Sequence, residues 1–108
     1  MALTRDFRDT VQARVRESAS FRRAMLVEAM DCFLSGETDV GKSILRDYIN
    51  ATIGFEALAK TVGKNPKSLH RMLSPTGNPN ASNLFEIIGF LQAHEGVELK
   101  VSAKRQAA

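Results

Sequence analysis

Apolar residues recur at intervals of three and four along nearly the whole chain, and this helical periodicity constrains the fold more than any other feature. Four glycines interrupt the pattern and divide it into helix-length segments: Gly36, Gly54, Gly63 and Gly96. Between the glycines, the periodicity predicts helices over about residues 3–17, 20–35, 39–53, 55–62, 66–73 and 81–94. The sequence therefore predicts a small all-α domain.

Residues that favour helix starts and turns support these boundaries. Ser20 and Asp39 stand where N-caps of the second and third helices are expected. Asn65 is the predicted cap of the fifth helix, and Pro66 follows at the first helical position, where its missing N–H costs nothing. Gly63 allows a turn with a positive φ between the fourth and fifth helices.

The C-terminal residues follow a different pattern. Val97, Leu99 and Val101 alternate with polar residues, and a period of two predicts a short strand over Val97–Val101. An all-helical chain offers this strand no partner, so its open edge requires another chain. We expect a homodimer in which Val97–Val101 pairs antiparallel with its symmetry mate.

Size and composition are those of one globular domain. The chain has 108 residues, of which 44% are hydrophobic and 25% are charged. We predict an N-terminal helical extension over residues 1–53 that packs on the core. Residues 54–102 then form the predicted functional region, which holds the fourth to sixth helices and the strand. Residues 103–108 form a flexible tail.

The sequence predicts a cytoplasmic protein without membrane segments. No apolar run reaches the roughly 18 residues that a bilayer span needs. The N-terminus carries charges where a secretory signal needs an apolar stretch. Cys32 is the single cysteine, so no internal disulfide is expected and we predict that it is a small core residue.

Positive charge is concentrated in the second half of the chain. Residues 1–50 hold eight basic and eight acidic residues, whereas residues 51–108 hold seven basic and four acidic ones. No acid lies between Glu56 and Glu86, but four basic residues do: Lys60, Lys64, Lys67 and Arg71. Such an island is typical of a surface that contacts phosphates, although charge alone leaves a solvated basic face as an alternative.

The stretch FEALAKTVGKNPKSLHRM, residues 55–72, meets the requirements of a helix-turn-helix in the right order. Ala59 is a small residue for the close contact of two steeply crossing helices, and Gly63 allows the turn between them. Leu69 and Met72 are placed to anchor the second helix to the core. An ordinary pair of core helices explains the apolar spacing, but not the small residue, the glycine, the capped start and the basic face together. The pattern favours a DNA-binding pair.

Two resemblances follow from these motifs. Phe55–Leu73 resembles the DNA-binding motif of Cro/CI-type repressors, and Gly54–Val101 is similar to the addiction-module antidotes, prophage-type antitoxins that repress their own operon. That family has a Ser-Pro-x-Gly-Asn-Pro loop after the recognition helix, matched here by residues 74–79. The likeness covers about half the chain. It implies a bacterial-type, dimeric, DNA-binding repressor with a toxin partner.

The Cro-type resemblance also implies the DNA-binding residues. The second helix is expected to present Lys67, Ser68 and Arg71 to base edges, side chains that suit donors and acceptors in the major groove. Residues expected nearer to the DNA backbone are Lys64, His70 and the helix cap Asn65. Pro66 departs from the polar residue common at this point of the motif, which removes one base contact.

Residues 36–43, GETDVGKS, match the phosphate-binding P-loop pattern literally. That chemistry requires a strand before the loop, whereas the helical segment MLVEAMDCFL stands there, and Glu37 and Asp39 would bring negative charge to the phosphates. We predict a helix–loop–helix junction instead. Neither metal-ligand spacing nor a catalytic set is present, so we expect no enzyme, no cofactor and no metal.

The leading hypothesis is a sequence-specific, double-stranded DNA-binding transcriptional regulator that acts as an autorepressing antitoxin. Three alternatives stay open on sequence alone. One is a plain regulator without a toxin, and another is a helical module whose basic helix binds an acidic protein. The third is a nucleotide hydrolase, which requires the P-loop match to be real.

Overall fold

The computed structural model describes residues 5–107, which form six α-helices joined by short turns and one longer loop. The helices are α1 (Arg5–Glu17), α2 (Ala19–Leu34), α3 (Thr38–Ala51), α4 (Phe55–Val62), α5 (Pro66–Met72) and α6 (Ala81–Glu95). The all-α prediction is therefore confirmed for this part of the chain. Leu3, where the first helix was predicted to begin, lies outside the described residues. Among the residues described, no helix combines the length and the apolar character needed to cross a bilayer.

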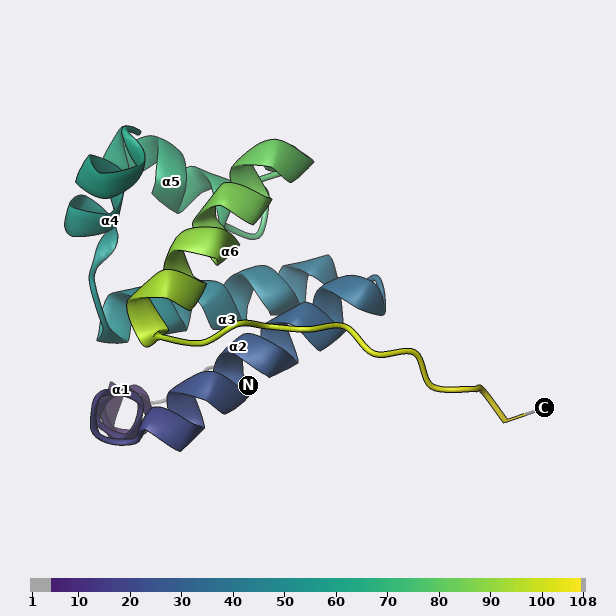
Figure 1. Ribbon diagram of the computed structural model, residues 1–108. Coiled ribbons are helices and arrows are strands. Elements are labelled where there is room, and N and C mark those ends of the chain that lie inside the picture. Colours follow the sequence, from purple (N-terminus) through teal and green to yellow (C-terminus); the bar gives the residue numbers. More distant parts are fainter. Residues whose placement is uncertain (1–4, 108) are drawn as a thin grey trace.

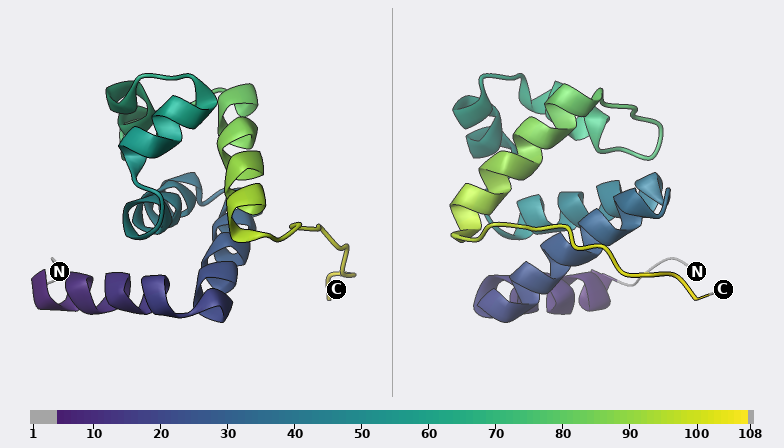
Figure 2. Two further views of the ribbon diagram at one scale, coloured as in Figure 1. Left: turned by 60° about the vertical axis from the view of Figure 1, so that its left-hand side comes forward. Right: turned by 45° about the vertical axis from the view of Figure 1, so that its right-hand side comes forward.

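The helices are arranged in two tiers (Figures 1 and 2). In one tier, α2 and α3 pack along each other and α1 contacts both. In the other, α4, α5 and α6 lie on the opposite side of α3. The helix α4 contacts α3, α5 and α6, so it joins the two tiers.

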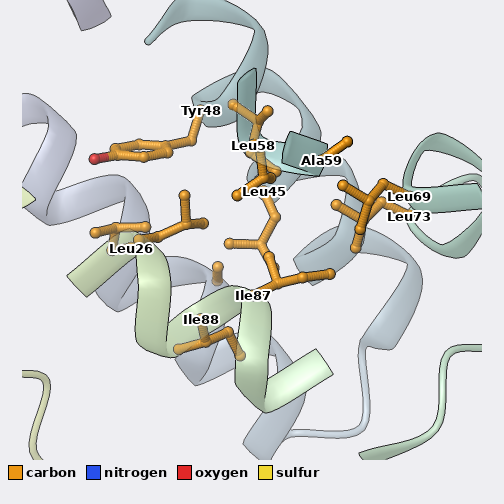
Figure 3. Packing of buried hydrophobic residues seen from close by; sticks show 12 residues of the cluster. Leu26, Leu45, Tyr48, Leu58, Ala59, Leu69, Leu73, Ile87 and Ile88 are labelled. Atoms are coloured by element: carbon orange, nitrogen blue, oxygen red, sulfur yellow. The ribbon is translucent and has the colours of Figure 1, made fainter. Parts of the chain in front are cut away.

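A single apolar cluster fills the space between the tiers (Figure 3). Its centre is the buried face of α3, where Leu45, Tyr48 and Ile49 are at most 1% exposed. Fully burying one such large apolar side chain stabilises the fold by about 1.5–3 kcal/mol. The opposite tier contributes the buried residues Leu58, Ala59, Leu69, Leu73, Ile87, Ile88 and Leu91. Residues of the predicted regions 1–53 and 54–102 thus share one core.

Two N-caps were predicted two residues too late in the chain. Ser18, not Ser20, caps α2, because Ser18 has extended backbone angles and its Oγ accepts a hydrogen bond from the Phe21 N–H at 3.2 Å. The helix α3 begins after Glu37 rather than Asp39, and its cap makes no side-chain hydrogen bond. Asp39 instead lies in the first turn, where a negative charge is favourable.

The predicted strand over Val97–Val101 is not seen in the single chain, where these residues have no regular secondary structure. A strand needs a second backbone beside it, and residues 5–107 supply none. The segment is held by α6 instead: the Val97 N–H donates to the Gln92 carbonyl at 3.0 Å, and the Leu99 N–H donates to Gln92 Oε1 at 2.7 Å. The alternation of apolar and polar side chains is nevertheless real, because Val97 and Leu99 pack against the core and Glu98 and Lys100 are exposed.

A buried carboxylate joins the end of α6 to the other tier. The Glu95 side chain is 6% exposed and accepts hydrogen bonds from Arg22 Nε at 2.9 and 3.1 Å and from the Tyr48 hydroxyl at 2.5 Å. Arg22 also donates from Nη1 to the carbonyls of Val15 and Arg16 at the end of α1. One ionic cluster therefore fixes α1, α2, α3 and α6 relative to one another.

The electrostatics of this cluster favour the charged form of Glu95. Burial by itself raises the pKa of that carboxyl, but the hydrogen bonds from Arg22 and Tyr48 and the charge of Arg22 outweigh burial and hold the pKa below its ordinary value of 4.5. Burial and the Glu95 carboxylate raise the pKa of Tyr48, so the phenol remains a donor.

We predict that Glu95→Gln lowers the free energy of unfolding at neutral pH by roughly 1–3 kcal/mol, since it leaves the half-buried Arg22 guanidinium without its counter-charge. A folded-state pKa below the unfolded one means that the stabilisation is present above about pH 4.5 and is lost as the pH falls through the folded pKa. Urea unfolding at several pH values checks this. Wild type should lose more stability than the variant on acidification.

The matched control is Glu17→Gln, because that carboxylate is exposed at the end of α1. Its effect should stay within about 0.5 kcal/mol. Equal acid sensitivity of wild type and Glu95→Gln would contradict the assignment.

Candidate nucleic-acid interface

A tight turn connects α4 to α5 and sets the angle between them. Gly63 follows the last residue of α4 with φ 69° and ψ 36°, in the left-handed region that favours glycine. The N–H groups of Gly63 and Lys64 both bond to the Ala59 carbonyl. Ala59 is 1% exposed in the core, so a larger side chain has no space there.

The start of α5 is as the sequence predicted. Asn65 has extended backbone angles, and its side-chain oxygen accepts a hydrogen bond from the Lys67 N–H at 2.8 Å. Pro66 occupies the first helical position. A seven-residue helix has little stability of its own, so this cap and the packing of one face define it.

The two sides of α5 differ completely in exposure. Leu69 and the capping residue Leu73 are 0% exposed and belong to the core cluster (Figure 3). The opposite side of the helix is exposed to solvent and carries Lys67, Ser68, His70 and Arg71. The structure therefore brings these four predicted residues together on one open face.

His70 lies at the edge of this face and contacts α4. Its ring is 5.0 Å, centroid to centroid, from the Phe55 ring, with an angle of 55° between the planes. A contact of this kind limits the rotamers of the imidazole. His70 is thus a more fixed group than Lys67 or Arg71.

Lys64 differs from the other predicted residues because it has an acidic neighbour. Its side chain is 22% exposed, and its Nζ lies 4.0 Å from Oε1 of Glu86 on α6. The acid-free island seen in the sequence is therefore not free of acid in space. Glu86 is 22 positions away along the chain, and no local pattern indicates the pair.

Two basic residues of α3 donate hydrogen bonds to the end of α5 and to the loop that follows it. Arg46 Nη1 donates a hydrogen bond to the Leu73 carbonyl. Lys42 is 5% exposed, and its Nζ donates to the Gly77 carbonyl at 2.6 Å and lies 3.2 Å from Asp39 Oδ1. A cation favours the negative end of a helix dipole, so the Arg46 contact stabilises the end of α5, whereas the Lys42 contact holds the loop after it. Sequence reasoning missed this role, although the spacing of four places both residues on one side of α3.

The loop after α5 folds back against the helix. Ser74 Oγ donates to the Arg71 carbonyl at 2.7 Å, and the Gly77 N–H donates to the Ser74 carbonyl at 3.0 Å. A Cβ at Gly77 would lie 1.9 Å from the Arg71 carbonyl oxygen, so only glycine fits. Between the loop and α5 is a shallow hollow of about 360 Å³, lined by Ser68, Arg71, Met72, Thr76, Gly77 and Asn78.

The P-loop-like residues 36–43 form the junction between α2 and α3, as predicted. Gly36 ends the turn after α2 with φ 81°, and α3 begins at Thr38, so Lys42 and Ser43 stand within a helix. The Lys42 amine is already bonded to Gly77. The backbone here is helical rather than curved around a phosphate.

We predict that Lys42→Ala lowers the free energy of unfolding by about 1–3 kcal/mol, because it leaves the half-buried Gly77 carbonyl without its donor. Lys60→Ala is the matched control, since Lys60 is exposed on α4 and its loss should change stability by no more than about 0.5 kcal/mol. Chemical denaturation measures both. Equal stability of the two variants would show that the Lys42 contact is dispensable, and ATP binding by wild type that Lys42→Ala abolishes would restore the P-loop interpretation.

Taken as chemistry, the open face of α5 presents an ammonium, a guanidinium, a hydroxyl and an imidazole within two helical turns. These groups donate hydrogen bonds to phosphate oxygens and to base edges, and the buried side of the helix fixes where they point. Comparison of the chain with protein-family models, with curated proteins and with solved structures found no match.

Proposed function

We propose that this chain is a sequence-specific, double-stranded DNA-binding transcriptional regulator, in which α4 and α5 form a Cro/CI-type helix-turn-helix and α5 enters the major groove. The observation that carries the proposal is the two-sided character of α5. Leu69 and Leu73 are completely buried, and the opposite side exposes Lys67, Ser68 and Arg71. A recognition helix needs this combination of a rigid base and a polar outer face.

The exposed residues have distinct roles in this proposal. Arg71 and Lys67 donate to guanine O6 and N7, and the Ser68 hydroxyl donates to or accepts from a neighbouring base. Lys64, His70 and the amide groups at the capped start of α5 contact phosphates, which positions the helix without selecting a sequence. The hollow beside Arg71 admits a sugar–phosphate segment next to the Thr76 hydroxyl.

The regulator acts as a homodimer in this proposal. One short helix contacts too few base pairs to single out an operator among genomic competitors. A two-fold symmetric pair places two such helices in successive major grooves about 34 Å apart. The element proposed to join the two copies is the segment Val97–Val101.

The likeness of residues 54–101 to addiction-module antidotes supports a narrower role, that of an autorepressing antitoxin with a toxin partner. A mobility shift on the DNA upstream of the gene, with and without the neighbouring gene product, tests both parts. Binding to this DNA and a supershift by the neighbour are expected. Absence of any shift contradicts the DNA-binding proposal, whereas a shift that the neighbour leaves unchanged indicates a plain regulator.

We predict that Lys67→Ala and Arg71→Ala each weaken binding to the operator by about 1–3 kcal/mol, with little change on unrelated DNA. Fluorescence anisotropy with both duplexes measures the difference. Arg23→Ala serves as a control, because Arg23 is an exposed cation of α2. If both α5 variants bind the operator like wild type, α5 is not the recognition helix.

Glu86 provides a second prediction through its contact with Lys64. Glu86→Gln removes a negative charge 4.0 Å from the lysine amine, so it should strengthen binding to every duplex alike and steepen the salt dependence. Lys64→Ala should weaken binding to all sequences and reduce the slope by about one charge. Affinity titrations over a range of salt concentrations measure both. Unchanged slopes in the two variants would place Lys64 away from the DNA.

A further inference from the structure

The C-terminal segment Val97–Val101 runs beside α2, with which it lines one hollow, and the chain beyond it projects away from the helices (Figure 2, left). Val97 and Leu99 are half-buried against the core, and the charged residues between them face solvent. One backbone edge of the segment is closed by Gln92, which accepts hydrogen bonds from the N–H groups of Val97 and Leu99. The segment therefore has the side-chain alternation of a strand and one satisfied edge.

The other edge of the segment is open. In an extended chain, alternate N–H groups point to opposite edges, so those of Glu98 and Lys100 point away from Gln92. Within residues 5–107, no hydrogen bond engages either of these two N–H groups. An edge of this kind is completed by a further strand.

We propose that the occupant of this edge is a second copy of the chain, paired antiparallel with Leu99 on the two-fold axis. The proposal rests on the proposed function, because it specifies how the DNA-binding dimer is joined. In this register Leu99 faces Leu99 of the second copy, and Val97 faces its Val101. Glu98 and Lys100 become the hydrogen-bonded positions, which are the ones with free N–H groups.

Charge selects this register over its neighbours. With Leu99 on the axis, Glu98 lies opposite Lys100 of the second copy, and the symmetry repeats this attractive pair. A shift that puts residue 98 on the axis opposes two glutamates, and a shift that puts residue 100 there opposes two lysines. A slip by one residue between the strands opposes apolar side chains to charged ones. Of these registers, only the one centred on Leu99 satisfies both the apolar and the charged positions.

Exposed apolar side chains lie beside the same segment. A hollow of about 550 Å³ lies beside the segment, and its lining includes Leu34, Phe85 and Val101, which are 65%, 58% and 74% exposed. Side chains of this size gathered at one place are typical of a protein contact surface. A second copy on the open edge brings apolar surface to this patch. The ion pairs, being exposed, fix the register more than the affinity.

Charge reversal tests the register in the full-length protein without DNA. Glu98→Lys and Lys100→Glu each turn two attractive contacts into two repulsive ones, so each should weaken dimerisation at low salt by about tenfold. The double variant restores opposite charges and should recover the wild-type dissociation constant in sedimentation experiments. A monomeric wild type overturns the proposal, as does failure of the double variant to recover.

Disulfide trapping tests the register independently of charge. In a Cys32→Ala background, Leu99→Cys places two thiols face to face on the axis, and mild oxidation should give a covalent dimer. Val101→Cys is the matched control, because its thiols would be about four residues, or roughly 13 Å, apart along the pair. Crosslinking at 101 but not at 99, or at neither position, contradicts the register.

The two proposals fail in distinguishable ways. A wild-type protein that is monomeric but still binds the operator overturns the interface and leaves the DNA-binding proposal intact. A dimer of the predicted register that does not bind operator DNA overturns the proposed function and leaves the proposed interface intact.

Discussion

The burial of α3 is the constraint on which the remaining structure depends. Leu45, Tyr48 and Ile49 of α3 form the centre of the core. Residues of α2 pack on one side of them, and residues of α4, α5 and α6 pack on the other. Polar side chains of the same helix form hydrogen bonds with other elements of the fold. Tyr48 bonds to Glu95 at the end of α6. Arg46 bonds to the Leu73 carbonyl at the end of α5, and Lys42 bonds to the Gly77 carbonyl in the loop after it. In this account, α3 is the platform that holds the seven-residue helix α5, which we propose recognises DNA.

Much of the fold was predictable because helices carry their own local signals. Periodic apolar residues identified all six helices, and the conformations of Gly63, Asn65 and Pro66 were predicted from residue type alone. The misplaced cap of α2 shows the limit of such signals. Ser18 and Ser20 are chemically equivalent at the same helix start, and only the backbone angles of Ser18 distinguish them. The predicted strand is not seen in the single chain, because the alternation of side chains is present but a strand also needs a neighbouring backbone.

The candidate site was predicted in part, and its supporting contacts were not predicted. The exposed face of α5 followed from helical geometry, since residues 67, 68 and 71 share the side opposite Leu69. The contacts of Lys42 with Gly77, Lys64 with Glu86 and Arg22 with Glu95 join residues that are 22 to 73 positions apart. Such pairs depend on tertiary packing, which local periodicity does not encode. The literal P-loop match also gave no indication that Lys42 donates a hydrogen bond to the loop after α5.

The most direct test of the central claim is a map of backbone amide chemical shifts during titration of the labelled protein with duplex DNA from upstream of the gene. The account predicts perturbations centred on residues 64–72, which comprise α5 and the two residues before it, and on the loop that follows. The shifts of α1 and of the exposed side of α2 should not change. Perturbations confined to α2 and the C-terminal segment, with α5 unaffected, would contradict it.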